Sequence, residues 1–135
     1  MNALQVVAMT TKTILLIHKK SNMQEVVQAC LTDLGGWNVR VSNSTLEGLR
    51  QAILDLPDSI ILDFSLSQLD KLLFLKELRK QPATQKIPVV LLTLKPKWSD
   101  LQQSYFQQYN VEVVIMNPFA PALLPVQIAR VLGWK

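Results

Sequence analysis

The strongest constraint on the fold comes from three short runs of Ile, Leu and Val, each followed directly by polar side chains. The runs occupy 14–17, 60–62 and 89–92, and they lead into His18, Asp63 and Thr93 respectively. Strands that are buried on both faces of a parallel sheet have this continuous apolar character. Because the carboxyl ends of parallel strands meet at one edge, where ligands bind, we expect a base, an acid and a hydroxyl to surround one pocket.

Strand-like and helix-like segments alternate along the chain with short connections, which is typical of an α/β fold. The expected strands are 13–17, 37–41, 59–63, 87–93 and 111–116. The second of these alternates between apolar and polar residues, so we expect it at an edge of the sheet. The sequence therefore predicts five βα units around one parallel sheet.

The helices between these strands are marked by their first residues. Capping serines stand at Ser21, Ser44, Ser67 and Ser99, each followed three residues later by Gln, Glu or Asp. Pro121 suits the first position of a last helix. The apolar residues expected along the helices are Met23, Val26, Val27, Cys30, Leu31 and Leu34 in the first, Leu46, Leu49, Ile53 and Leu56 in the second, Leu69, Leu72, Leu73, Leu75 and Leu78 in the third, and Leu124, Ile128, Val131 and Leu132 in the last.

Composition excludes several classes of protein. At 135 residues with 49% hydrophobic content, the chain is long enough for one compact domain. It has no apolar run near the roughly 20 residues that cross a bilayer, no basic segment typical of a signal peptide, and one cysteine, which excludes an internal disulfide. We therefore expect a cytoplasmic protein outside the membrane. The net charge of +4 is scattered and forms no basic stripe, so nucleic acid is not an expected partner.

Three motifs, in order and at matching spacing, resemble landmarks of the receiver domains of bacterial response regulators. Residues 60–63 resemble the strand that ends on the phosphate-accepting aspartate, residues 87–93 the fourth strand with its switch Ser/Thr, and Asn117-Pro118-Phe119 the Lys-Pro-Phe motif. The resemblance covers 12–134 and leaves 1–11 as an N-terminal extension. The ending, residues 123–134, resembles stand-alone cyanobacterial receivers in particular.

This resemblance implies a flavodoxin-like (CheY-like) (βα)5 three-layer sandwich with a central five-stranded parallel sheet. It implies a role in two-component signalling and no enzymatic activity, with a histidine kinase or a downstream effector as partner. Asp63 would be the phospho-acceptor position, and Thr93 and Val114 the switch positions, although Val114 stands where the family has an aromatic residue.

The departures from the family pattern concern the pocket. The resemblance places two Mg²⁺-binding acids at positions occupied here by His18 and Lys19, and a lysine at the position of Asn117. At about 4 Å and an effective dielectric constant of roughly 20, one pair of unit charges is worth on the order of 4 kcal/mol. Exchanging acids for basic groups should therefore abolish Mg²⁺ binding, and we expect no metal or other cofactor. Lys19 could instead reach Asp63 and form an internal ion pair.

These residues favour a degenerate receiver that signals by protein–protein contact. The alternative is a working phosphorelay receiver that a histidine kinase phosphorylates on Asp63. A basic nucleic-acid-binding module, or an anion sensor that uses Lys19, Lys20 and Lys95, ranks lower.

The resemblance also implies a face for partners or homodimers, formed by the helix after Ser99, the strand 111–116 and the last helix. Aromatic residues that could enlarge this contact surface are Trp98, Tyr105, Phe106 and Tyr109.

Overall fold

The computed structural model describes residues 11–19, 22–94, 104 and 106–134. Its strands are β1 (Thr13–Ile17), β2 (Asn38–Ser42), β3 (Ser59–Leu62), β4 (Val89–Thr93) and β5 (Val111–Ile115). Its helices are α2 (Asn22–Ala29), α3 (Thr45–Asp55), α4 (Gln68–Lys80) and α6 (Leu124–Leu132), with a π-helical turn η1 (Cys30–Leu34) and a 3-10 turn η2 (Pro121–Leu123). Most of the expected N-terminal extension lies outside the described residues.

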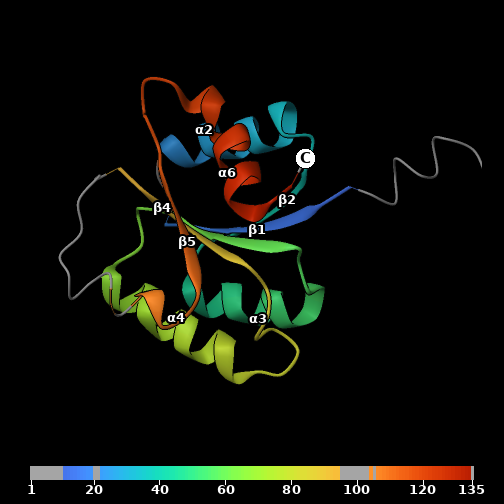
Figure 1. The fold of residues 1–135 in the computed structure, drawn as a ribbon, viewed down its shortest axis with the longest axis vertical. Coiled ribbons are helices and arrows are strands. Elements are labelled where there is room, and N and C mark those ends of the chain that lie inside the picture. Colours follow the sequence, from blue (N-terminus) through green and yellow to red (C-terminus); the bar gives the residue numbers. More distant parts are fainter. Residues whose placement is uncertain (1–10, 20–21, 95–103, 105, 135) are drawn as a thin grey trace, which may run out of the picture.

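The five strands form one parallel sheet in the order β2-β1-β3-β4-β5. Helices α2 and α6 cover one face and α3 and α4 cover the other, as Figure 1 shows, so the expected three-layer CheY-like sandwich is confirmed. The chain leaves β1 for the outer strand β2 and then returns to β3 on the other side of β1. This reversal between β1 and β3 places a crevice at their carboxyl ends, which is where ligands bind in such sheets.

The strand predictions hold to within two residues at each end. β2 begins one residue later than expected, β4 begins at Val89, after Pro88, and β3 ends at Leu62. Asp63 is therefore the first residue beyond β3. β2 forms one edge of the sheet, as its alternation predicted, since it pairs with β1 on one side only.

Two apolar clusters lie on the two faces of the sheet. The cluster under α3 and α4 contains Leu15, Ile17, Ile60, Leu62, Phe74, Leu75, Leu78, Val89 and Leu91, among others. The cluster under α2 and α6 contains Ile14, Leu16, Val27, Leu31, Ile61, Val90, Leu92, Val114, Leu124 and Ile128, among others. Alternate residues of β1, β3 and β4 enter opposite clusters, which explains why these three strands are apolar throughout.

The prediction for the buried face of helix α4 is correct for Leu72, Leu75 and Leu78 and wrong for Leu69 and Leu73. Its buried residues are Lys71, Phe74, Leu75 and Leu78, whereas the side chains of Leu69 and Leu73 are 64% and 52% exposed. The buried positions follow the spacing i, i+3, i+4 and i+7 that defines one helix face. A search for apolar residues alone does not find the whole face, because its first residue is a lysine.

Helix α3 packs through two small residues and through Leu49, which contacts the core as expected. Its buried residues are Gly48 and Ala52, whereas Leu46, Ile53 and Leu56 of the expected stripe are exposed. A β-carbon at Gly48 would collide with the Ile17 side chain, so the missing side chain lets α3 lie close against β1, next to the pocket.

The helix ends agree with the capping pattern where they are described. Ser44 accepts a hydrogen bond from the backbone N–H of Glu47, and Ser67 accepts one from that of Asp70. Ser21 and Ser99 lie outside the described residues.

In the first helical segment Val27 and Leu31 are buried as expected, but Val26 and Leu34 are exposed. Pro121 starts the 3-10 turn η2, which leads into α6.

Candidate functional site

His18 and Asp63 lie beside each other at the carboxyl ends of β1 and β3. Ile17 and Leu62 are paired in the sheet, so the next residue of each strand follows in register. The backbone N–H of Asp63 donates to the Ile17 carbonyl at 2.9 Å, and that of His18 donates to the Ser42 carbonyl at 3.1 Å. Both side chains are nearly removed from water, with exposed fractions of 1% for His18 and 2% for Asp63.

A tight turn follows Asp63 and ties the two loops of the pocket together. The Oδ2 atom of Asp63 accepts a hydrogen bond from the Ser65 N–H at 3.2 Å, and the Asp63 carbonyl accepts one from Leu66 at 3.2 Å. The hydroxyl of Ser65 accepts a hydrogen bond from the Lys19 N–H at 2.9 Å. Ser65, which sequence reasoning did not single out, therefore links the loop after β1 to the loop after β3.

The imidazole of His18 is held by its own loop. Its Nδ1 atom lies 2.8 Å from the Lys19 carbonyl oxygen, and because a carbonyl only accepts, Nδ1 is the donor. Its Nε2 atom is buried and has no hydrogen-bond partner among the described residues. His18 therefore presents a ring nitrogen, and not a carboxylate oxygen, at the end of β1.

The suggested ion pair between Lys19 and Asp63 does not form. Lys19 is exposed, and no ion pair joins the two side chains in the described part of the chain. The backbone of Lys19 faces Ser65, and its side chain is on the water side of the loop. Lys20 and Lys95, also considered as basic groups of this edge, lie outside the described residues.

A buried lysine follows on α4: Lys71 has an exposed fraction of 5%, and among the described residues it forms no ion pair within 4.0 Å. Burial lowers the pKa of the Lys71 ammonium, and the negative charge of Asp63 acts in the opposite direction and raises that pKa. Sequence reasoning did not assign Lys71 to this site. The signal that could have found it is the spacing from Lys71 to Phe74, Leu75 and Leu78, which puts the lysine on the buried helix face.

The other expected site residues have different surroundings. Thr93 ends β4 at the same edge of the sheet and is 9% exposed. Val114 is buried within the core under α2 and α6. Asn117 is exposed, and its side-chain oxygen accepts a hydrogen bond from the Phe119 N–H at 2.9 Å, so it shapes its own turn. Its role differs from that of a lysine reaching an acceptor carboxylate.

The donor atoms of this pocket fit Mg²⁺ poorly. Mg²⁺ requires oxygen ligands in near-octahedral geometry, and carboxylates usually supply the protein's share. Among the described residues, no group of three or more His, Cys, Asp and Glu side chains could hold a metal ion. The buried Asp63 instead shares its surroundings with an imidazole and an ammonium group.

The sheet order is that of a flavodoxin-like fold, and a buried aspartate directly follows its central strand. The family model of the response regulator receiver domain matches residues 14–129, and the chain belongs to this family. Receiver domains are signalling modules and not enzymes, and they interact with histidine kinases and effectors in two-component systems.

Known relatives agree with this assignment. Response regulator Rre1 of Synechocystis sp. is 30% identical over 121 residues, which cover 90% of this chain and 52% of that protein. The chain spans about half the length of the curated relatives it matches.

Two solved structures show the same fold. Chemotaxis protein CheY4 of Vibrio cholerae is similar with a TM-score of 0.76 at 22% identity, covering 90% of this chain and 99% of that one. The receiver domain of sensor histidine kinase PA1611 from Pseudomonas aeruginosa has a TM-score of 0.73 at 25% identity, covering 92% and 99%. In that receiver domain a magnesium ion is coordinated in the active-site cleft.

None of the helices in the described part of the chain is long and apolar enough to span a membrane.

Proposed function

We propose that this chain is a cytoplasmic receiver protein that signals through contacts with other proteins and whose acceptor pocket operates without Mg²⁺. The observation that carries this proposal is the set of side chains around the buried Asp63, which includes His18 and Lys71 in a pocket that is expected to be acidic.

The chemistry of phosphoryl transfer supports the loss of metal dependence. Transfer to a carboxylate brings two anionic groups together, so it depends on positive charge placed between them. In a receiver with an acidic pocket, carboxylates hold Mg²⁺, and the metal ion supplies that positive charge. In this pocket a lysine next to Asp63 repels a divalent cation, and the buried Nε2 of His18 is not the oxygen ligand that Mg²⁺ prefers.

Mg²⁺ titration by calorimetry, followed by incubation with acetyl phosphate and mass spectrometry, tests the proposal. We expect no heat of Mg²⁺ binding at millimolar concentrations and no added phosphoryl group. The matched control restores the acidic pair with His18→Asp and Lys19→Asp in one chain, and this variant should gain measurable Mg²⁺ binding because it regains two carboxylates.

The competing function is that of a phosphorelay receiver modified on Asp63, which the retention of Asp63 and Thr93 at their strand ends favours. Mg²⁺-dependent addition of one phosphoryl group to the unaltered chain, lost in Asp63→Asn, would establish that function and overturn the metal-free proposal.

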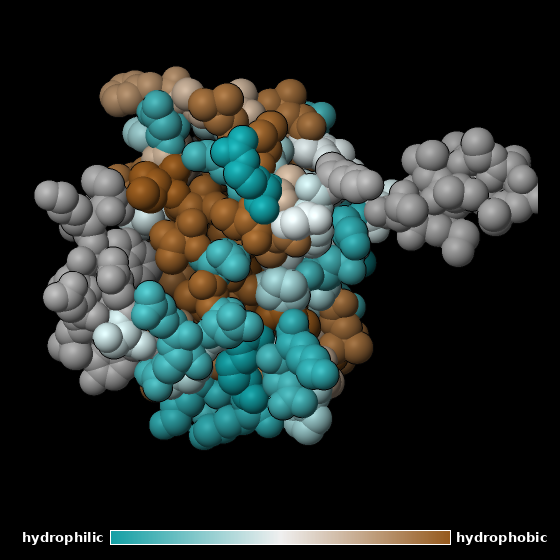
Figure 2. All heavy atoms as spheres, in the orientation of Figure 1, coloured by the Kyte–Doolittle hydropathy of each residue, from teal (hydrophilic) through white to brown (hydrophobic). Residues whose placement is uncertain are grey.

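We place the partner-binding face on β5 and α6. Val113 and Ile115 of β5 are 41% and 45% exposed, and they line a hollow of about 260 Å³ together with Gln127, Arg130 and Val131. Figure 2 shows apolar residues gathered over β5 and α6, whereas the surface over α3 and α4 is mostly hydrophilic.

The aromatic residues expected to extend this contact surface do not support it where they are described, because Phe106 is buried and Tyr109 is half-buried. Trp98 and Tyr105 lie outside the described residues.

Light scattering after size exclusion tests whether this face also joins two copies of the chain. We expect a dimer for the unaltered chain and a monomer for Ile115→Lys, because a charge on β5 would have to be buried in the contact. Leu54→Lys, at an exposed leucine of α3, is the control that should remain dimeric. A monomeric unaltered chain at all concentrations would remove the homodimer from the proposal.

A further inference from the structure

Phe119 presents an aromatic ring to solvent in the turn that follows β5. Its side chain is 95% exposed, more than any other large apolar side chain in the described part of the chain. An aromatic ring carries a large apolar surface, and here that surface stays in water. The ring therefore adds nothing to the core of this chain and is available for contact with another molecule.

The turn that carries Phe119 is fixed by hydrogen bonds and by prolines. The Phe119 N–H donates to Oδ1 of Asn117 at 2.9 Å, and the Ala120 N–H donates to the Asn117 carbonyl at 3.0 Å. Pro118 and Pro121 stand on either side of these residues, and their rings fix the backbone angle φ. Because the backbone is already ordered, burial of the ring in a contact costs little additional entropy.

A stripe on the last helical segment leads from this turn to the hollow on β5 and α6. Leu123 and Val126 are 56% and 59% exposed, and Gln127 and Arg130 line the hollow. These four residues follow the spacing i, i+3, i+4 and i+7, so they share one helix face. The turn and the hollow therefore lie at the two ends of one largely apolar surface (Figure 2).

The hollow suits an aromatic ring in size and in chemistry. Its volume is about 260 Å³, and a cavity of roughly 150 Å³ already binds benzene. Val113, Ile115 and Val131 give it apolar walls, and Arg130 adds a guanidinium group. A guanidinium binds the face of an aromatic ring, and Arg130 forms no ion pair among the described residues.

A second copy of this chain supplies the ring that the hollow can accept. Phe119 is not among the residues that line the hollow of its own copy, so the ring and the hollow are separate features of one surface. In a two-fold dimer both copies contribute the same surface, so each ring can meet the hollow of the other copy. β5 and α6 carry one exposed charge each, Glu112 and Arg130, and because these have opposite signs the contact does not require like charges to meet.

We propose that the chain forms a two-fold dimer in which Phe119 of each copy inserts into the hollow of the other copy, against Arg130 and the apolar side chains of β5. This inference rests on the homodimer included in the proposed function. It names the side chain that provides most of the contact and the place where that side chain is buried.

Sedimentation velocity over a range of concentrations tests the ring. Phe119→Ala should raise the dissociation constant of the dimer about a hundredfold or more, because two rings are buried per dimer and each is worth at least about tenfold. Phe119→Leu, which keeps an apolar side chain but offers no ring face to Arg130, should give an intermediate value. Leu54→Ala, at an exposed leucine of α3, is the matched control that should leave the dimer unchanged.

A mixing experiment tests whether the ring is exchanged between copies. Val113→Trp fills the hollow from its own chain, so this variant should also dimerise weakly. A mixture of Phe119→Ala and Val113→Trp should associate about tenfold more tightly than either variant does alone, because the mixed pair has one ring and one open hollow that match. Ile115→Trp gives the same comparison if Val113→Trp does not fold.

The possible results separate this contact from the function proposed above. Unchanged dimerisation of Phe119→Ala, or a mixture that associates no better than its separate variants, would overturn the exchanged ring and leave the dimer face on β5 and α6 in place. A monomeric unaltered chain at all concentrations would overturn both the exchanged ring and the homodimer, and it would assign the hollow to a different protein. Neither result bears on the metal-free pocket, which Mg²⁺ titration tests independently.

Discussion

Helix α4 buries a cation near each end, and the two are held in opposite ways. Arg79, in the last turn, is half-buried and donates only to backbone carbonyls. Its guanidinium contacts the carbonyls of Tyr109 at 2.9 Å, Gln85 at 3.0 Å, Ile87 at 2.7 Å and Asn110 at 3.3 Å. Lys71, near the start of the helix, is more deeply buried, and among the described residues its side chain forms no ion pair within 4.0 Å.

The difference separates a structural cation from a site cation. Arg79 sits where the helix dipole favours positive charge, and its planar donors match several carbonyls from the segments before β4 and β5. Lys71 sits at the unfavourable end of the same helix and has one anionic neighbour. Burial lowers the pKa of both side chains, but only for Lys71 does an acid oppose this effect. A buried positive charge that the helix dipole disfavours indicates a residue of the site. One that the dipole favours indicates a residue that stabilises the fold.

The largest effect is expected from Arg79→Ala. The change leaves several backbone carbonyls without a protein donor, and each buried one costs about 1–3 kcal/mol, so the free energy of unfolding should fall by about 3 kcal/mol. Urea denaturation measures the loss. The adjacent Lys80→Ala, which removes only an exposed pair with Glu77, is the control. A loss no greater than that of the control would refute the structural role of Arg79.

A smaller effect is expected from the titration of Lys71. Its pKa is lower in the folded chain than its ordinary value of 10.5, so the unfolded chain binds more protons between these two values. The free energy of unfolding should therefore gain a rising contribution as the pH increases from the folded pKa towards 10.5. Urea midpoints measured across this alkaline range should show the rise in the unaltered chain and its absence in Lys71→Met.

The same titration carries a second check on the Asp63 neighbour. Asp63 raises the pKa of Lys71, so Asp63→Asn should move the rise to lower pH. If the free energy of unfolding of Lys71→Met rises with pH in the same way, the titration belongs to another group. Lys71 and Arg79 would then not differ in the way described above.

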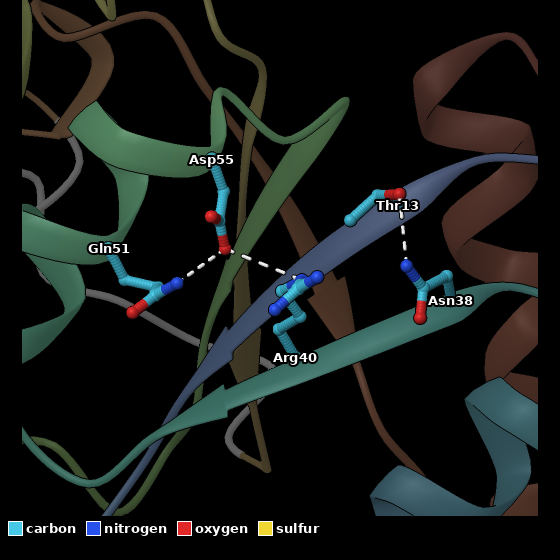
Figure 3. A network of polar contacts seen from close by, with 5 residues as sticks. All are labelled: Thr13, Asn38, Arg40, Gln51 and Asp55. Carbon is cyan, nitrogen blue, oxygen red and sulfur yellow. Dashed lines mark hydrogen bonds and ion pairs between the residues drawn. The ribbon is translucent and has the colours of Figure 1, made fainter.

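The smallest effect is expected from a surface ion pair, which joins Arg40 of β2 and Asp55 of α3. Figure 3 shows Asp55 between Arg40, at 3.4 Å, and the amide of Gln51. The Arg40 side chain is 55% exposed, so Arg40→Ala should cost less than about 1 kcal/mol, and less still at high salt. Thermal unfolding at two salt concentrations measures this. A cost as large as that of Arg79→Ala would show that burial does not separate the two cations.

Much of the fold followed from local pattern. The apolar runs predicted the strands, the alternation in β2 predicted the edge, and Ser44 and Ser67 cap helices as expected. The helix faces followed less well, because α3 packs through Gly48 and Ala52, and α4 begins its buried face with a lysine. Hydrophobic periodicity identifies a face by its apolar residues, so it misses a face that includes a glycine or a charge.

The sequence alone determined the parallel α/β architecture and brought His18, Asp63 and Thr93 to one edge, because strand period and strand ends are local properties of the chain. Only the tertiary structure decided which lysine near this edge is buried. Lys19 is adjacent to His18 in sequence yet stays in water, whereas Lys71, eight residues beyond Asp63, is buried with it. The reason is that burial of a long flexible side chain depends on how helix and sheet pack together, and that packing is set by contacts between distant segments.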